Sequence, residues 1–288
     1  MYKLTKIIYL FLILIDKIIH LFSKKFQFIL FLKEHIEDKS YKEVNVLGSK
    51  VKFFIPNKAV DLRVKRIFSK EPGTLKWIDN FKNDENTIFW DIGANIGLFS
   101  LYASQKHNNI KIFSFEPSTS NLRVLSRNIS INKLQERILI NQFPLTNNEN
   151  SYLDLKETRF QEGCSLNTFG EDFGHDGNKI YEKNSYKVFG NNINNLIDNK
   201  ILDIPDYIKI DVDGIEHLIL EGADKYLNSK KIKSISVEIN EKFEEQKVRV
   251  NQILLSNKFK FVSKNNSLDN PNSKNRNTFN YIFEKLNL

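Results

Sequence analysis

Residues 88–97 read Ile-Phe-Trp-Asp-Ile-Gly-Ala-Asn-Ile-Gly, and this stretch decides the fold. Its first five residues, apolar except for Asp91, predict a buried β-strand. Gly93 and Gly97 then predict a tight turn, because glycine permits backbone bends and close approaches that other residues resist. Residues 98–104 continue at helical spacing. Such a strand, turn and helix start present backbone N–H groups at a positive dipole end, which suits an anionic group on a ligand.

Strands and helices alternate beyond this stretch. The pattern predicts strands over 88–92, 111–116, 137–141, 207–212 and 235–239, then a closing pair over 259–263 and 278–284. Helices are predicted over 98–104, 119–132, 216–228 and 244–256. This alternation indicates an α/β, Rossmann-like fold with about seven strands, mostly parallel, and helices on both faces. The polar loop 264–277 shows no helix pattern, so the last strand is expected to be antiparallel.

Three further regions are distinguished by composition. Residues 1–42 form an apolar, helical N-terminal segment, and residues 43–288 form the main domain. Within that domain, residues 43–86 form an N-terminal cap with strands over 43–46 and 50–55 and helices over 59–68 and 72–81. Residues 144–200 are rich in Asn, Gly, Asp and Ser. We expect them to be an insertion of short strands and loops over the mouth of the active site.

Bulk composition narrows the class of protein. The 288 residues are 41% hydrophobic, enough for one large α/β domain and a small extension. The net charge of +8 favours anionic partners in general, but the lysines are spread along the chain. No basic run interleaved with aromatic residues predicts a nucleic-acid partner. Cys164 is the single cysteine, which excludes an intrachain disulfide and fits a cytoplasmic setting.

The N-terminal segment allows three interpretations. Residues 7–15 are an unbroken apolar run that Asp16 and Lys17 interrupt, and no small-residue cleavage site follows. Residues 1–35 either make peripheral contact with the inner face of a membrane through an interfacial helix, pack as a helical pair on the domain or on a second subunit, or form an uncleaved signal anchor. In the first case anionic headgroups would meet the lysines, which are Lys3, Lys6, Lys17, Lys24 and Lys25. The second case leaves a homo-oligomer open.

Glu116 ends the second strand of the predicted sheet. A carboxylate at this place in a doubly wound sheet lies beside the first glycine turn and accepts hydrogen bonds from ribose hydroxyls. The alternative is an ordinary strand-end carboxylate. An adenosyl ligand by itself does not separate NAD from S-adenosylmethionine. The dinucleotide fingerprint is G-x-G-x-x-G, however, and residues 93–97 lack its central glycine.

A second polar cluster follows the strand at 207–212. It contains Asp211, Asp213 and Glu216, which could ligate a hard divalent ion, orient an amine or hydroxyl, or act as a base. Asp213 or Glu216 could instead only cap the next helix. His217 is either a surface helix residue or a base. The other four histidines are scattered, and none is paired at metal-ligand spacing.

With these motifs in order, the chain resembles an FkbM-type S-adenosylmethionine-dependent methyltransferase over residues 72–285. The resemblance is carried by residues 91–97 and 115–117, Asn128 and Asn132, and residues 163–166, 209–216, 220–223 and 237–239. Three positions depart from the family pattern. Asp213 stands where the family usually has Glu, Ile193-Asn194 replaces Leu-Asp, and Pro144-Leu145 replaces Ala-Leu.

The resemblance implies a class I methyltransferase sheet, S-adenosylmethionine as cofactor, and roles for individual residues. Backbone N–H groups of residues 93–97 would meet the methionine moiety, Asp91 would orient the loop or the ammonium group, and Glu116 would hold the ribose. The cofactor-binding residues so implied are Asp91, Gly93, Ala94, Asn95, Gly97, Glu116 and Asp211. The candidate general bases are Asp211, then Glu238, then His217; a divalent metal at Asp211 is allowed but not required.

The resemblance further implies an O-methyltransferase acting on a hydroxyl of a sugar, polysaccharide or related natural product, so a small-molecule or glycan acceptor is expected. Two alternatives belong to other classes. One is an NAD(P)-binding oxidoreductase or epimerase, against which the missing central glycine counts. The other is a catalytically silent, membrane-associated scaffold, against which the intact set of Asp91, Glu116 and Asp211 counts.

Overall fold

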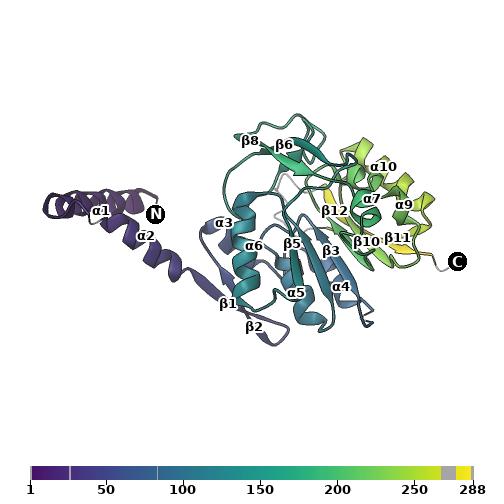
Figure 1. The fold of residues 1–288 in the computed structure, drawn as a ribbon, viewed down its shortest axis with the longest axis horizontal. Coiled ribbons are helices and arrows are strands. Elements are labelled where there is room, and N and C mark those ends of the chain that lie inside the picture. The colour runs from purple at the N-terminus through teal and green to yellow at the C-terminus, as the bar shows by residue number, and fades with distance from the viewer. Residues whose placement is uncertain (1, 26, 83, 267–276, 287–288) are drawn as a thin grey trace.

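The computed structural model describes residues 2–25, 27–82, 84–266 and 277–286. Two helices, α1 (Tyr2–Phe22) and α2 (Phe28–Asp38), come first and project away from the main body (Figure 1). An antiparallel pair follows, β1 (Tyr41–Val46) and β2 (Ser49–Phe54). Helices α3 (Lys58–Lys65) and α4 (Pro72–Asp79) complete the N-terminal cap. Among the described residues, none of the helices combines the length and apolar character needed to cross a bilayer.

The main sheet has seven strands in the order β11-β12-β10-β9-β3-β4-β5. Its strands are β3 (Ile88–Ile92), β4 (Lys111–Phe115), β5 (Ile138–Asn141), β9 (Tyr207–Ile210), β10 (Ser234–Asn240), β11 (Phe259–Asn266) and β12 (Thr278–Lys285). The neighbours from β5 to β10 pair in parallel, and β12 runs antiparallel to both β10 and β11. The predicted Rossmann-like methyltransferase sheet with an antiparallel last strand is therefore confirmed. The strand order reverses at β3, where a ligand crevice is expected at the carboxyl ends.

Helices cover both faces of this sheet and make a three-layer domain (Figure 1). Helices α5 (Leu98–Lys106) and α6 (Thr119–Ile131) pack with the cap on one face. The other face carries α7 (Ile193–Asp198), α8 (Glu216–Glu221), α9 (Asp224–Leu227) and α10 (Glu244–Ser256). Because side chains alternate along a strand, the neighbours Phe89 and Trp90 are both buried but belong to different clusters. The sheet is thus a rigid platform that is apolar on both sides.

The region 144–200 contains a second, smaller sheet with the order β7-β6-β8. Its strands β6 (Ser151–Glu157), β7 (Asn167–Phe169) and β8 (Asn184–Gly190) are antiparallel. Figure 1 shows β6 and β8 beside one edge of the main sheet. Residues of β6 and β7 line the same pocket as the residues that follow β3, β4 and β9. The insertion therefore forms one wall of that pocket.

Two predicted elements end differently in the structure. The predicted helix 216–228 is two short helices, because the chain breaks at Gly222. A Cβ atom at Gly222 would lie 2.3 Å from the Thr146 carbonyl oxygen, and the Asn194 N–H donates to the Gly222 carbonyl. The predicted strand 207–212 ends at Ile210, which leaves Asp211 just beyond it. Most of the predicted loop 264–277 lies outside the described residues.

Asn128 and Asn132 of α6 join the cap to the main domain. The Asn128 amide accepts the Phe54 N–H at 2.8 Å and donates to the Ile96 carbonyl at 2.9 Å. One turn later, Asn132 accepts the N–H of Lys52 and donates to its carbonyl. Since residues four apart share a helix face, α6 supports β2 much as a neighbouring strand would. The two asparagines of the motif thus have a structural role.

Candidate active site

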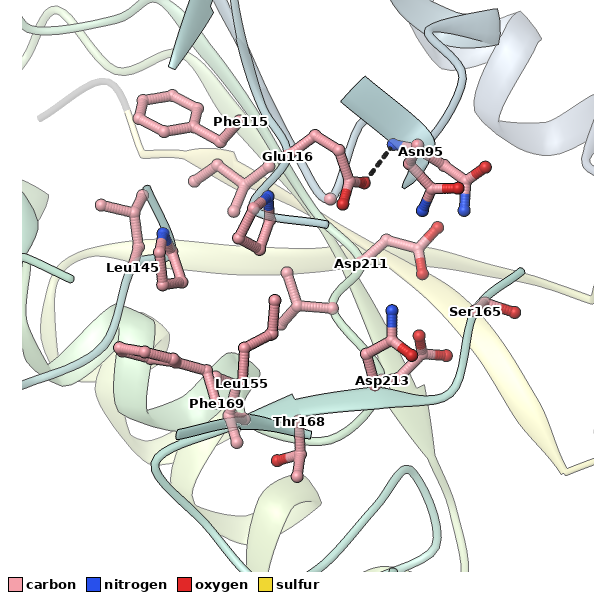
Figure 2. Close-up of a pocket in the computed structure, with 18 of the residues that line it drawn as sticks. Asn95, Phe115, Glu116, Leu145, Leu155, Ser165, Thr168, Phe169, Asp211 and Asp213 are labelled. Atoms are coloured by element: carbon pink, nitrogen blue, oxygen red, sulfur yellow. Dashed lines mark hydrogen bonds between the residues drawn. The ribbon is translucent and has the colours of Figure 1, made fainter. Parts of the chain in front are cut away.

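A pocket lies at the carboxyl ends of β3, β4, β9 and β10, under the small sheet. It encloses about 880 Å³ when its open mouth is included. Figure 2 shows its two halves: Phe115, Leu145, Leu155 and Phe169 lie on one side, and acidic and amide groups lie on the other. The sheet platform and the insertion therefore build a pocket with an apolar end and a polar end.

The 93–97 loop differs from its predicted role. Its N–H groups were expected to face the ligand, but the N–H groups of Gly93 and Ala94 both donate to the Phe115 carbonyl. The Asn95 N–H donates to Glu116, and the Gly97 N–H donates to the Ala94 carbonyl. These four N–H groups form hydrogen bonds within the protein. Three of them fasten the loop to Phe115 and Glu116 at the end of β4. The expectation was that backbone N–H groups of residues 93–97 meet the methionine moiety, and these four have partners within the protein instead.

The two glycines of the loop serve packing. Gly97 has φ +85°, and a Cβ atom on it would lie 2.5 Å from the Leu125 side chain of α6. Gly93, also at positive φ, faces the backbone of Asp211. Gly93 and Asn95 line the pocket, Ala94 lines a smaller recess beside it, and Gly97 lines neither. Close approach within the protein, not approach to a ligand, is what the glycines permit.

Asp91 is fully buried in the centre of β3 and does not line the pocket. Its Oδ2 accepts the Ser100 hydroxyl at 2.5 Å, and that hydroxyl lies 2.7 Å from the hydroxyl of Ser114. Burial raises the pKa of Asp91, although the nearby Lys209 ammonium opposes that rise. Asp91 therefore fastens α5 to β3 and β4. Neither predicted role, orienting the 93–97 loop or the ammonium group of the cofactor, is among these contacts.

Glu116 lies in the pocket wall, just beyond the end of β4. Its Oε2 accepts the Asn95 N–H at 2.8 Å (Figure 2), and its Oε1 accepts the Ser118 N–H at 2.9 Å. Burial raises the pKa of Glu116 to about 7, although both N–H groups work against that rise. Each carboxylate oxygen has a second lone pair, so the fixed carboxylate can still accept two hydroxyl donors. This is the geometry expected of a ribose-binding carboxylate.

The 163–166 segment is held against the pocket from several elements. The Nδ2 groups of Asn95 and Asn121 both donate to the Cys164 carbonyl, at 2.8 and 3.2 Å. The Leu166 N–H donates to Asp213 Oδ2 at 2.7 Å. Asn95 Oδ1 is buried in the pocket wall with no hydrogen-bond partner among the described residues. A ligand donor would satisfy this acceptor, which marks the polar end as a binding site.

Asp211 and Glu238 form a coupled pair in the polar end of the pocket. Lys209 donates to Asp211 Oδ2 at 2.7 Å. Burial alone would raise the pKa of Asp211, but the ammonium groups of Lys209 and Lys70 and a hydrogen bond from Glu238 lower it to about 2. Burial and the Asp211 charge raise the pKa of Glu238 well above its ordinary value. The two carboxyls therefore differ in acidity: the pKa of Asp211 is lowered and the pKa of Glu238 is raised.

Glu216 and His217 are structural in this fold. Glu216 accepts the N–H groups of Val212 and Gly214, so it closes the turn that follows β9. His217 is buried against Phe173 and Phe243 and does not line the pocket. Burial lowers its pKa to about 4. The prediction of His217 as a third candidate base is therefore wrong, because its ring packs away from the pocket.

Sequence reasoning missed several residues that line the pocket. Arg63 and Lys70 reach it from the cap, and Asn121 reaches it from α6. Phe143, Leu155 and Thr168 come from β5 onward into the insertion. No motif marks the two basic residues, since only the folding of the cap brings them to the sheet edge. Ser165 belongs to the 163–166 motif, but the motif alone assigns no role to its side chain.

No cluster of three or more His, Cys, Asp or Glu side chains suited to a metal ion occurs in the described part of the chain. The pocket does suit an adenosyl ligand. Its apolar end can take a flat base, Glu116 can take ribose hydroxyls, and the orphaned Asn95 Oδ1 can take a further donor. The residues of the pocket therefore fit the predicted cofactor.

Comparison with known proteins shows similarity to a family of domains and to a curated protein. The methyltransferase FkbM domain matches residues 91–261, more than half of the chain. Methyltransferase sdnD of Sordaria araneosa is 51% identical over 47 residues, which are 16% of this chain and 18% of that protein. The chain thus matches less than a fifth of the length of that curated relative.

Two solved structures show a more distant similarity. Precorrin-6y C5,15-methyltransferase from Geobacter metallireducens has 14% identity and a TM-score of 0.43, covering 75% of this chain and 87% of that one. TYW2 of M. jannaschii in complex with AdoMet has 14% identity and a TM-score of 0.41, covering 86% and 87%. The domain match over residues 91–261 includes the loop, Glu116 and the Asp211–Glu238 pair. The chain belongs to the FkbM methyltransferase family, whose S-adenosylmethionine cofactor its pocket fits.

Proposed function

We propose that this protein is an S-adenosylmethionine-dependent O-methyltransferase whose acceptor is a hydroxyl of a sugar, polysaccharide or related natural product. The observation that carries the proposal is the pair of Asp211 and Glu238 at the polar end of the pocket. An alcohol is a poor nucleophile near neutral pH, so its transfer reactions need a group that accepts its proton. A carboxylate pair beside the cofactor pocket supports that role.

Different residues of the pocket bind different parts of the cofactor. The apolar end, with Phe143, Leu145 and Phe169, excludes water around the base, and Glu116 accepts the ribose hydroxyls. The bound cofactor supplies an electrophilic methyl group. What the protein contributes is alignment of an acceptor oxygen with that group and exclusion of water, because methyl transfer is an in-line displacement.

Asp211 and Glu238 are the groups that can remove the proton from the acceptor hydroxyl. The pKa of Asp211 is about 2, which makes its carboxylate a weak base near neutral pH. Glu238 has the raised pKa and is the stronger base once it is ionised. A cation bound beside the pair favours that ionisation, since an opposite charge lowers the pKa of a nearby carboxyl. We therefore infer that Glu238 accepts the acceptor's proton while Asp211, held by Lys209, orients the hydroxyl.

The polar mouth supports a hydroxyl-rich acceptor. Arg63, Lys70, Asn121 and Ser165 all line this part of the pocket, and each offers hydrogen-bond donors. Family membership and the missing central glycine both count against an NAD(P)-binding oxidoreductase or epimerase. A silent scaffold would need no coupled carboxylate pair, and the assay below separates it from an enzyme.

The test is transfer of isotopically labelled methyl groups to a panel of sugars and glycans, followed by mass spectrometry. Glu238→Gln retains the shape of the protonated acid, so we expect unchanged thermal stability and cofactor affinity. The turnover rate should fall by about 10²–10⁴-fold, the usual contribution of a general base. The matched control is Glu241→Gln, because Glu241 directly follows β10 and lies outside the pocket.

Three results would count against the proposal. If methyl groups reach only nitrogen or carbon acceptors, the protein is a methyltransferase but not an O-methyltransferase. Full activity of Glu238→Gln would remove its role as base. Cofactor binding without transfer to any hydroxylated acceptor would favour the scaffold.

A further inference from the structure

Helices α1 and α2, together called the α1–α2 hairpin (residues 2–38), expose an extensive apolar surface. Neither helix contains a buried residue. The exposed fraction is 64% for Ile7, 61% for Phe11, 83% for Leu21 and 88% for Phe22. Soluble monomers rarely expose a contiguous apolar patch of this extent, and such patches mark interaction sites. The hairpin therefore needs a partner that covers it.

We propose that the α1–α2 hairpin docks this protein on an anionic lipid surface. Ile7, Ile8, Tyr9, Leu10 and Phe11 are consecutive, and all are exposed. Five consecutive residues span more than one turn of an α-helix, so apolar side chains occur all round α1 at this level. Within residues 7–11 the apolar side chains leave no polar stripe, and a helical segment of this kind suits an apolar surrounding. Acyl chains provide that surrounding.

The positive charge at the start of the hairpin favours an anionic surface. The hairpin contains six lysines and four carboxylates, and its positive charge is concentrated in residues 2–25, which hold five lysines and one carboxylate, Asp16. Lys3, Lys6 and Lys17 are three and eleven residues apart, spacings that return a helix of 3.6 residues per turn close to the same face. A basic stripe on an otherwise apolar helix is the pattern of interfacial membrane helices, in which lysines meet anionic headgroups.

Asp16, which interrupts the apolar run, has a role inside the hairpin. Its Oδ1 accepts the Ile29 N–H at 3.0 Å, in the first turn of α2. This bond satisfies one of the donors that a helix start leaves free, and it holds the two helices together. The carboxylate therefore serves the fold of the hairpin, and its presence does not oppose docking at a lipid surface.

The base of the hairpin is fastened to the catalytic domain. Glu37 of α2 pairs with Arg123 at 2.5 Å and with Arg127 at 2.7 Å, both on α6. Arg123 also pairs with Glu162 at 2.7 Å, and Glu162 directly precedes the 163–166 segment of the pocket wall. One arginine thus joins the docking hairpin to the wall of the pocket. Docking would then hold the pocket in a fixed place relative to the lipid surface.

A second copy of the chain is the competing occupant. Two hairpins could bury their apolar faces together, but their twelve lysines would then gather with only eight carboxylates in one small assembly. An anionic surface instead neutralises those charges. The lipid surface is therefore the occupant that satisfies both the apolar area and the charge.

The experiment is flotation of the full-length protein with phosphatidylcholine vesicles that contain or lack phosphatidylglycerol. We expect binding to the anionic vesicles only. Replacing Lys3, Lys6 and Lys17 by Gln should weaken binding by about 100-fold, from roughly fivefold for each lysine near an anionic surface. The matched control replaces Lys50, Lys133 and Lys187, which are exposed on the main body, by Gln. This control should bind like the unchanged protein.

A second pair of variants tests the apolar contribution. Ile7→Ser with Phe11→Ser should abolish flotation, whereas Phe160→Ser with Tyr181→Ser, equally exposed on the insertion, should not. Equal binding to neutral and anionic vesicles would overturn the proposal. So would a dimer in light scattering that does not float and that the Ile7 and Phe11 variant dissociates. Flotation needs no methyl transfer, so its result is independent of the proposed reaction.

Discussion

A Cβ atom placed on Gly93 would lie 1.8 Å from the backbone carbonyl oxygen of Asp211. This contact joins the ends of β3 and β9, the two strands between which the strand order reverses. It brings the 93–97 loop against the carboxylate pair of the polar end. The glycine that marks the sequence motif is therefore required by a neighbouring strand.

Gly93→Ala should consequently destabilise the protein and weaken cofactor binding together. The positive φ of +84° costs a non-glycine residue about 1–2 kcal/mol, and the clash with the Asp211 carbonyl adds to that cost. Gly48→Ala is the matched control, since Gly48 has φ +87° and nothing within 4 Å of its Cβ position. Thermal unfolding and calorimetric titration compare the two. Equal losses of stability would show that backbone strain alone matters at Gly93.

The two asparagines of α6 offer a second test of structure. Asn128→Ala removes the partners of the Phe54 N–H and the Ile96 carbonyl, both within the buried join between cap and domain. Each unsatisfied buried group costs about 1–3 kcal/mol, so the free energy of unfolding should fall by about 2–5 kcal/mol. Asn132→Ala should cost less, because its bonds to Lys52 are partly exposed. Urea unfolding measures both, and the reverse order would refute this assignment.

The sheet could be predicted because its signals are local. Apolar runs such as residues 88–92 and 235–239, separated by helical periodicity, specify a mainly parallel sheet whatever the details of packing. The break at Gly222 could not be predicted, since it arises from contact with Thr146 in a distant loop. Likewise, the end of β9 depends on how Glu216 closes the following turn.

The sequence could predict which carboxylate residues gather in the site, but not which contacts each residue makes there. Glu116 and Asp211 follow β4 and β9, and Glu238 lies near the end of β10, so the topology of the sheet brings the three together. Sequence cannot show that the loop N–H groups are taken by the Phe115 carbonyl, or that His217 packs between aromatic rings. Arg63 lies in a cap helix without a motif, and only tertiary folding carries it to the pocket.

The buried pair of Lys209 and Asp211 predicts a pH-dependent loss of stability. The Lys209 side chain is only 1% exposed, and its ammonium faces both Asp211 and Asp91. Lys209→Met removes the cation that is hydrogen-bonded to Asp211 and leaves only Lys70 near that carboxylate, so it should cost about 3–5 kcal/mol at pH 7. In the unchanged protein the pKa of Asp211 is lowered, so its contribution is present above the unfolded value near 3.8 and is lost toward pH 2.

In the Lys209→Met variant, by contrast, the uncompensated carboxyls take up protons more readily, so lowering the pH should narrow the difference from the unchanged protein. Thermal unfolding between pH 7 and pH 4 measures this. The control is Lys225→Met, whose ammonium pairs with the exposed Asp198 at 2.6 Å; solvent screens this pair, so its removal should change stability little at any pH in this range. A constant difference across this pH range would contradict the role of Lys209 as counter-ion.

Cofactor affinity should depend on pH through Glu116. Burial raises the pKa of Glu116 to about 7, and the ionised carboxylate is the better acceptor for ribose hydroxyls. Between pH 6 and pH 8 its ionised fraction rises from about one tenth to nine tenths, so affinity should rise by up to about tenfold. Native stability has the opposite sign: the folded protein retains the proton longer, so stability falls as pH rises from about 4.5 to 7.

Two matched variants separate Glu116 from other buried acids. Glu116→Gln should weaken cofactor binding by about 10–100-fold, since hydrogen bonds to a charged group contribute about 1.5–3 kcal/mol each, and it should flatten the pH dependence. Glu216 is equally buried and its pKa is also raised to about 7 by burial, but it lies outside the pocket. Glu216→Gln should therefore retain the slope of affinity against pH. A slope that survives in Glu116→Gln and vanishes in Glu216→Gln would place the titrating group in the turn after β9, and the ribose assignment would then fail.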